Sequence, residues 1–225
     1  MRKILFPLFL GIAGCAILIS LCIWQINRLA EKEGILDEID GRLAGAARPL
    51  TLDVVEDSDE YTRVAFAGMT TGEELHVLVS GTSAGSGYRV VSEFQTDQGA
   101  KILLDQGLLP WDAKETSPLI TDMKVTGTLL WPDDQNSSTP DADLEANIWY
   151  ARNVANMAAV LGTEPLMVVA TQTTPQDSRL TPLPVGTANI KNDHLEYAIT
   201  WFLLAVVWAI MTLFLIIRTT RQKEV

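Results

Sequence analysis

Two uncharged, apolar runs of twenty residues, 4–23 and 198–217, lie near the two ends of the chain. A helix rises about 1.5 Å per residue, so each run would cover roughly the 30 Å hydrocarbon thickness of a bilayer. The first run contains one proline and two glycines, which membrane helices tolerate. These runs predict two transmembrane helices, the second with an interfacial start at residue 192, and the rest of the chain must fold between them.

The first run has a second interpretation, as the leader of a lipoprotein. Ile12-Ala13-Gly14-Cys15 resembles a lipoprotein cleavage box in which Cys15 is the lipidated residue. Residues 16–23 stay apolar after this cysteine, however, and complete a membrane-spanning length. We therefore expect a retained transmembrane helix.

About 170 residues separate the runs, enough for one globular domain with its own core. The chain has 17 basic and 28 acidic residues, and 12 basic and 27 acidic residues remain when the terminal tails are left out. Such a negative charge disfavours nucleic acid as a partner. Both cysteines, Cys15 and Cys22, lie in the first run, so we interpret them as packing residues and expect the domain to be stabilised by packing without disulfides.

The segment after the first run predicts a helix that continues it through residues 24–45, because apolar residues recur at spacings of three and four. The middle of the chain predicts strands separated by glycine-containing turns. The expected strands cover residues 61–68, 74–79, 88–95, 100–105, 125–131 and 166–171, and a short helix covers residues 152–161. The expected fold class is α+β: two transmembrane helices flanking a mainly antiparallel β extracytoplasmic domain with one or two short helices.

The two tails carry five lysines and arginines in very few residues, which predicts that both ends are cytoplasmic and that the domain is periplasmic. Four basic residues after the first run argue against this: Arg28, Lys32, Arg42 and Arg48. Long domains translocate largely regardless of charge, so we base the predicted orientation in the membrane on the charges of the tails. The expected parts are tails at 1–3 and 218–225, transmembrane helices at 4–23 and 192–217, a helical extension at 24–45 and the domain at 46–191.

The sequence offers little material for an active site. It has two histidines, no phosphate-binding loop ending in Gly-Lys-Ser/Thr and no His-Glu-x-x-His pair. The glycine-rich stretch 81–87 precedes an expected strand, which indicates a flexible loop, and residues 133–143 indicate an exposed acidic loop. His76 lies in an expected strand with no second ligand spaced to join it, so we expect a structural role. We expect no catalytic residues and no enzymatic activity.

His194 differs from His76 because of the residues that share its helix face. Tyr197, Trp201, Ala205 and Trp208 follow it at increments of three, four, four and three. A neutral imidazole is an ordinary axial ligand of haem iron, and neighbouring aromatic side chains could bury a flat macrocycle. The alternative is that this stripe anchors the helix at the membrane interface and packs on the first helix. Periodicity alone favours the alternative.

Two sequence blocks at opposite ends of the chain resemble those of a known family. Residues 24–32, WQINRLAEK, resemble the Trp-Gln-x-x-Arg-Leu-x-x-Lys signature of the surfeit locus protein family, and residues 192–201, NDHLEYAITW, resemble its Asn-Asn-His-Leu-Gln-Tyr-Ala-x-Thr-Trp block. Between them, Tyr61-Thr62-Arg63-Val64 with Gly68, Gly87-Tyr88-Arg89-Val90, Leu104-Asp105-Gln106-Gly107-Leu108-Leu109-Pro110 and Val125-Thr126-Gly127 follow in the family's order. The resemblance therefore covers nearly the whole chain.

This resemblance implies an assembly factor for a haem–copper terminal oxidase (cytochrome c oxidase) in a bacterial inner membrane, a chaperone and not an enzyme. It would assist haem A delivery to, or haem-site formation in, the catalytic subunit, with haem A bound transiently. The implied partners are that subunit, the lipid bilayer and, as a further candidate, a haem A synthase. The alternative is a scaffold that holds the oxidase subunits during assembly without touching haem.

The resemblance also implies roles for six residues. His194 would be the axial ligand of the haem iron, and Tyr197 and Trp201 would be neighbours of the ring. Trp24, Gln25 and Arg28 would brace the first helix against the second or meet a haem propionate, for which an arginine fork is suited. Arg28 has an equal alternative as an interfacial anchor that reaches lipid phosphate.

The chain departs from the family pattern at two places. Gln106 and Leu108 stand where the family has an arginine and an aromatic residue, so a propionate or partner contact made there by the arginine is in doubt. Asp193 and Glu196 replace neutral amides beside the histidine, and nearby negative charge favours imidazolium over the neutral ligand form. The size of that effect depends on how exposed these carboxylates are.

Overall fold

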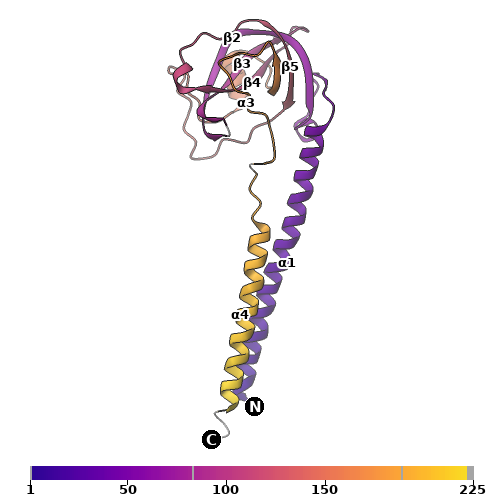
Figure 1. Ribbon diagram of the computed structural model, residues 1–225, viewed down its shortest axis with the longest axis vertical. Helices are drawn as coiled ribbons and strands as arrows, with labels where there is room; N and C mark the ends of the chain where they lie inside the picture. Colours follow the sequence, from indigo (N-terminus) through magenta and orange to yellow (C-terminus); the bar gives the residue numbers. More distant parts are fainter. Residues whose placement is uncertain (1, 83, 189, 222–225) are drawn as a thin grey trace. The chain divides into compact units, whose positions relative to one another are not determined.

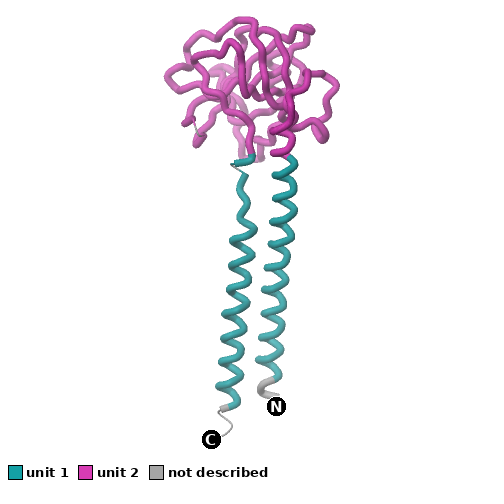
Figure 2. Tube along the Cα trace, turned by 45° about the vertical axis from the view of Figure 1, so that its right-hand side comes forward, with its two compact units in different colours: residues 1–38, 187–225 teal, residues 39–186 magenta. Residues whose placement is uncertain are grey.

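The computed structural model describes residues 2–82, 84–188 and 190–221 and divides them into two compact units. One unit is built from residues 1–38 and 187–225 and the other from residues 39–186, coloured differently in Figure 2. Each unit is described by itself.

The first unit contains α4 (His194–Arg221) and α1 (Arg2–Ala44) as far as residue 38, two antiparallel helices that lie side by side (Figure 1). Both are long and apolar enough to cross a membrane, and only 6% of the most apolar window of each is buried. A core helix of a soluble domain would be mostly buried. The outward-facing leucines, isoleucines and phenylalanines of these helices instead suit a lipid environment.

The two helices pack along a seam of small residues. Buried and half-buried positions recur at steps of four and three along α1, among them Gly11, Cys15, Leu18, Cys22, Gln25 and Leu29. On α4 such positions are His194, Ala198, Trp201, Ala205, Thr212 and Ile216. This is the period of antiparallel and parallel coiled coils alike. A Cβ added to Gly11 would lie 2.1 Å from Thr212 Cγ2, and the Cys15 Sγ lies 3.8 Å from the carbonyl oxygen of Ala205. Small residues therefore allow the backbones to approach closely.

The second unit is a β-barrel with short helices. Its strands are β1 (Arg48–Pro49), β2 (Arg63–Thr82), β3 (Gly85–Thr96), β4 (Lys101–Pro110), β5 (Asp122–Leu129) and β6 (Met167–Thr174). They pair in the order β1-β2-β3-β4-β6-β5, and β5 also pairs with β2, which closes a ring of five strands. The β4–β6 pair is parallel, and the other pairs of the ring are antiparallel. This is the connectivity of OB-fold barrels, a fold that by itself assigns no function.

The strand β2 closes the ring because its two halves have different partners. Residues from Arg63 to Met69 pair with β5, and residues from Gly68 onward pair with β3. The register shifts between Thr70 and Glu74, where Gly72 has a φ of +93°. A positive φ is open to glycine at little cost, so the chain can bend there and pass from one partner strand to the other.

Apolar side chains fill the barrel and also cover one part of its outer surface. Ile102 and Leu104 of β4 belong to one buried cluster, whereas Leu103 between them belongs to a second. The second cluster includes Met157 and Ala158 of α3 (Val154–Leu161), together with Trp149. Both faces of β4 are thus buried, which follows from the alternation of side chains along a strand.

The structure confirms the expected fold class, with apolar helices near the two ends and a mainly antiparallel sheet between them. The expected short helix is α3, which Asn153 caps by accepting a hydrogen bond from the Asn156 N–H and which ends at Gly162 in the left-handed region. Two single-turn helices, α2 (Glu56–Asp59) and η1 (Trp111–Ala113), were not expected. The expected strands 61–68 and 74–79 are two halves of β2, because the intervening Thr-Thr-Gly bends the strand without ending it.

Candidate functional site

The first residue of α4, His194, meets α1 through one hydrogen bond. Its Nδ1 lies 2.7 Å from Oε1 of Gln25, although the two residues are 169 positions apart in the sequence. Gln25 is 7% exposed, whereas the histidine is half-buried. Burying an amide without a hydrogen bond costs free energy, so this contact satisfies the Gln25 side-chain oxygen within a largely apolar helix pair.

The aromatic residues expected around His194 divide into two groups. Trp201 is half-buried on the seam, on the same face as Ala198 and Ala205, which are 3% and 5% exposed. Tyr197 is 54% exposed and lies beside the seam. Tyr197 and Ala198 both lie near the helix face of His194, since steps of three and four both return to one face. Ala198 is the one of the two that faces α1, because its small side chain lets the backbones of α1 and α4 approach each other.

On α1, the motif residues around Gln25 point outward. Trp24 is 51% exposed, as an aromatic side chain at a membrane interface often is. The Arg28 Nη1 lies 2.7 Å from a carboxylate oxygen of Glu31, one turn further along α1, in an exposed ion pair. The structure therefore brings His194 and Gln25 together and leaves the Trp24 and Arg28 side chains on the surface of this unit.

The charges expected to disturb His194 are partly compensated. A carboxylate oxygen of Asp193 lies 2.5 Å from the Lys191 Nζ, and Glu196 is exposed. The Lys32 Nζ donates to the carbonyl oxygen of Lys191 at 2.6 Å, which ties α1 to the segment just before α4. The negative charge beside the imidazole is therefore weaker than the sequence suggests, because one carboxylate has a cation of its own.

A buried acceptor without a partner lies two residues before the histidine. The side-chain oxygen Oδ1 of Asn192 is buried and has no hydrogen-bond partner among the described residues. Native proteins satisfy most buried polar atoms, so such an oxygen often marks a place where a water or a ligand donates a hydrogen bond. No group of three or more histidine, cysteine, aspartate or glutamate residues in the described parts of the chain could hold a metal ion by itself.

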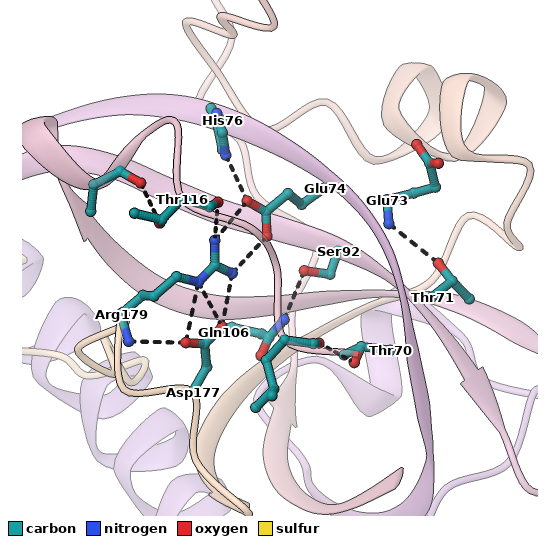
Figure 3. Close-up of polar contacts among 12 residues, drawn as sticks. Thr70, Thr71, Glu73, Glu74, His76, Ser92, Gln106, Thr116, Asp177 and Arg179 are labelled. Atoms are coloured by element: carbon teal, nitrogen blue, oxygen red, sulfur yellow. Dashed lines mark hydrogen bonds and ion pairs between the residues drawn. The ribbon is translucent and has the colours of Figure 1, made fainter. Parts of the chain in front are cut away.

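His76 belongs to a buried charge network in the barrel (Figure 3). Its Nε2 lies 3.0 Å from a carboxylate oxygen of Glu74, and the guanidinium of Arg179 donates to both carboxylate oxygens of Glu74 and to both of Asp177. Arg179 also donates to the carbonyl oxygen of Thr116 at 3.0 Å. The network ties the chain after β6 to the middle of β2, which is a structural role.

Burial alone would raise the pKa of the Glu74 carboxyl, but hydrogen bonds from His76 and Arg179 and the charge of Arg179 outweigh it and lower that pKa. The pKa of Asp177 is lowered in the same way, against burial, by the Arg179 side chain and backbone. The pKa of Arg179 is raised despite burial because both carboxylates hold its proton. All three groups are therefore charged at neutral pH.

The two positions that depart from the family pattern lie inside the barrel unit. Gln106 is 7% exposed and donates from Nε2 to the Ser92 hydroxyl at 2.7 Å, and Leu108 is 3% exposed. The neighbouring Asp105 is fully buried and accepts from Arg89 at 2.6 Å. This chain thus has no cation at position 106 that could contact a propionate. Gln106 and Leu108 instead contribute to packing and to the pairing of β3 with β4.

The residue types along the helix seam, and not only their spacing, indicate in the sequence where the two helices meet. A polar amide and two small residues, Gln25, Ala198 and Ala205, occupy positions where an apolar stripe would be expected to hold large side chains. Glutamine in such a stripe indicates a buried hydrogen bond, since an unpaired amide there would be costly. The sequence did not reveal its partner, nor the unpartnered oxygen of Asn192.

Comparison with known proteins identifies the family of the chain. The model of the SURF1 family matches residues 12–206. A SURF1-like protein of Rickettsia conorii is 30% identical over 88% of this chain and 86% of its own length, and one of Rickettsia felis is 30% identical over 84% and 88%. Surfeit locus protein 1 of Xenopus tropicalis is 26% identical over 81% of this chain and 67% of its own length. The family match covers the whole barrel, most of α1 and the first half of α4. The chain belongs to the SURF1 family.

Proposed function

We propose that this protein is an assembly factor for a haem–copper terminal oxidase, and that it binds haem A transiently through His194 while the haem site of the catalytic subunit forms. The observation that carries the proposal is the hydrogen bond between Gln25 and His194, which joins the two family blocks at one point of the helix pair. Under this proposal the catalytic subunit is the main partner, and a haem A synthase would supply the cofactor.

The chemistry of the residues around His194 supports haem as the ligand. When bound, haem supplies an iron that accepts an axial imidazole. His194 offers a ring whose Nε2 has no hydrogen-bond partner among the described residues, and Asn192 offers an unpartnered acceptor close by in the sequence. Exposed Tyr197 and Trp24, with half-buried Trp201, would provide apolar area for a macrocycle. Arg28 would meet a propionate by leaving its exposed pair with Glu31.

The proposal extends to the membrane. Five lysines and arginines in the tails favour cytoplasmic ends, so the barrel would lie in the periplasm of a bacterial inner membrane. The helix end that carries His194 would then lie at the periplasmic surface. Enzymatic activity is not part of the proposal, because the described residues of the barrel use their buried charged groups for ion pairs.

The test is an optical spectrum of the detergent-purified protein, expressed with and without a haem A pathway. We expect a haem signal only with the pathway, and we expect His194→Ala to lose most of it. Leu195→Ala is the matched control, since it shortens an exposed neighbour on the same helix and should leave occupancy unchanged. Full haem occupancy in His194→Ala would remove this residue from the role.

The second candidate is a haem-free scaffold that holds the oxidase subunits. It is favoured by the same hydrogen bond, because Gln25 already gives His194 a structural partner on α1. Haem-free protein that still co-purifies with the catalytic subunit, in wild type and in His194→Ala, would support the scaffold. Loss of co-purification only in haem-free preparations would support the carrier.

A further inference from the structure

The contact between Gln25 and His194 defines which ring nitrogen of the histidine carries the proton. The acceptor is the amide oxygen Oε1 of Gln25, 2.7 Å from Nδ1. An amide oxygen has lone pairs and no hydrogen, so Nδ1 must donate. In a neutral imidazole the other nitrogen, Nε2, then holds the free lone pair.

The donor and acceptor are both held in place by the helices that carry them. Gln25 is 7% exposed in the seam of α1, and the ring begins α4 one turn before Ala198, which is 3% exposed. The Lys32 Nζ holds the carbonyl oxygen of Lys191 at 2.6 Å, three residues before the ring. The acceptor of the Nδ1–H group is thus buried in the seam, and Nε2 of the ring is directed away from the amide.

We propose that Gln25 is a positioning residue for haem binding: it holds His194 in the Nδ1–H tautomer and so makes Nε2 the atom that meets the iron. This inference rests on the proposed haem-binding function. An axial histidine whose other ring nitrogen donates a hydrogen bond is fixed in orientation and is a more basic ligand. A more basic ligand stabilises ferric over ferrous iron, so the bond to Gln25 lowers the midpoint potential of the bound haem.

The first test needs no haem. Full-length protein labelled with ¹⁵N in its histidine rings is purified haem-free in detergent, and the two histidines are assigned by comparison with His194→Ala. We expect Nδ1 of His194 to be the proton-bearing nitrogen in wild type, and also in Gln25→Glu at a pH where the ring is neutral, since that side chain keeps an acceptor oxygen. We expect Gln25→Leu to shift the ring toward the Nε2–H form. A wild-type ring protonated at Nε2 overturns the inference.

The second test adds ferric haem A to the same variants. Loss of a hydrogen-bond partner behind a ligand costs about 10–100-fold in affinity, so Gln25→Leu should weaken binding to this extent and raise the midpoint potential. At a pH where the ring is neutral, Gln25→Glu should bind at least as tightly as wild type and lower the potential, because its carboxylate is the stronger acceptor. Asn27→Leu is the matched control, an exposed amide two residues along the same helix. Unchanged affinity and potential in Gln25→Leu would contradict the inference.

The two tests separate the inference from the function on which it rests. If wild type binds no haem, the proposed function fails, and the nitrogen spectrum still decides whether Gln25 sets the tautomer. If haem binds and the tautomer does not respond to Gln25, the function stands and the positioning role fails.

Discussion

Arg179 and Glu74 form a two-pronged ion pair inside the barrel unit, with Nη1 3.3 Å from Oε1 and Nη2 3.1 Å from Oε2. Their side chains are 12% and 7% exposed. The pair joins β2 to the segment that follows β6. A largely buried ion pair therefore connects residues that are 105 positions apart in the sequence.

We expect Arg179→Met to destabilise the protein strongly. Removing the guanidinium leaves the Glu74 and Asp177 carboxylates buried without their cation, and breaking a buried pair typically costs about 3–5 kcal/mol. The measurement is the free energy of unfolding of the full-length protein in detergent, by denaturant titration. Arg48→Met is the control, because it removes a more exposed ion pair with Asp59 and should cost about 1 kcal/mol or less. Equal costs for the two variants would contradict this account.

Acid should weaken the same network. The carboxyl pKa values of Glu74 and Asp177 are lowered from 4.5 and 3.8, so these groups contribute stability above their unfolded values and lose it as pH falls through their folded values. We expect the free energy of unfolding to fall from about pH 5 toward pH 2 in wild type. In Arg179→Met this fall should flatten, because neither carboxyl retains the cation that lowers its pKa. A parallel decline in both proteins would show that other groups carry the acid sensitivity.

The helix pair makes a prediction about two glycines of α1. A methyl at Gly11 would lie 2.1 Å from Thr212 Cγ2 and 3.0 Å from its Cβ, whereas a methyl at Gly34 meets nothing within 4 Å. We expect Gly11→Ala to destabilise the helix pair by about 1–3 kcal/mol through overpacking. We expect Gly34→Ala to stabilise the helix by about 0.5–1 kcal/mol, since alanine loses less backbone entropy. Loss of helical circular dichroism on titration with a denaturing detergent measures both, and a gain in both variants would exclude the close seam.

In the barrel, Gly107 has a φ of +112°, and a Cβ there would lie 2.2 Å from the carbonyl oxygen of Thr181. Gly99 also has a positive φ, of +85°, but has open space around it. Gly99→Ala should therefore cost about 1–2 kcal/mol, from the left-handed conformation alone. Gly107→Ala should cost about 1–3 kcal/mol more, from the clash with backbone. Comparable melting temperatures for the two variants would contradict the crowding at Gly107.

The helices and most strands could be predicted from the sequence because their signals are local. Twenty uncharged residues specify a membrane-length helix, and alternating residues with a glycine turn specify a hairpin such as that of β3 and β4. The sequence could not show that β2 is one strand, because Thr71-Gly72 reads as a turn. Pairing of β2 with both β3 and β5 is a long-range property, and it keeps the bent strand continuous.

The candidate site was predicted in part. The family block identified His194 and Gln25 as residues of interest, but periodicity could not tell which of Tyr197 and Ala198 faces the other helix, since both lie within one turn of the histidine face. The bond between Gln25 and His194 joins residues 169 apart, and it depends on how α1 and α4 are aligned along the seam. The alignment of two helices that are far apart in the sequence cannot be read from the spacing of residues within either helix.

The ring closure of the barrel limits the ways in which another protein can bind it. A sheet with an open side can be extended by a strand from a partner, as in β-augmentation, and it also risks fibrous aggregation. Here β2 and β5 meet, and the short β1 covers the part of β2 that β3 does not reach. A strand from another protein could therefore pair only with the short edges that lie outside the ring, such as that of β1. Binding elsewhere on this unit must use side chains and loops.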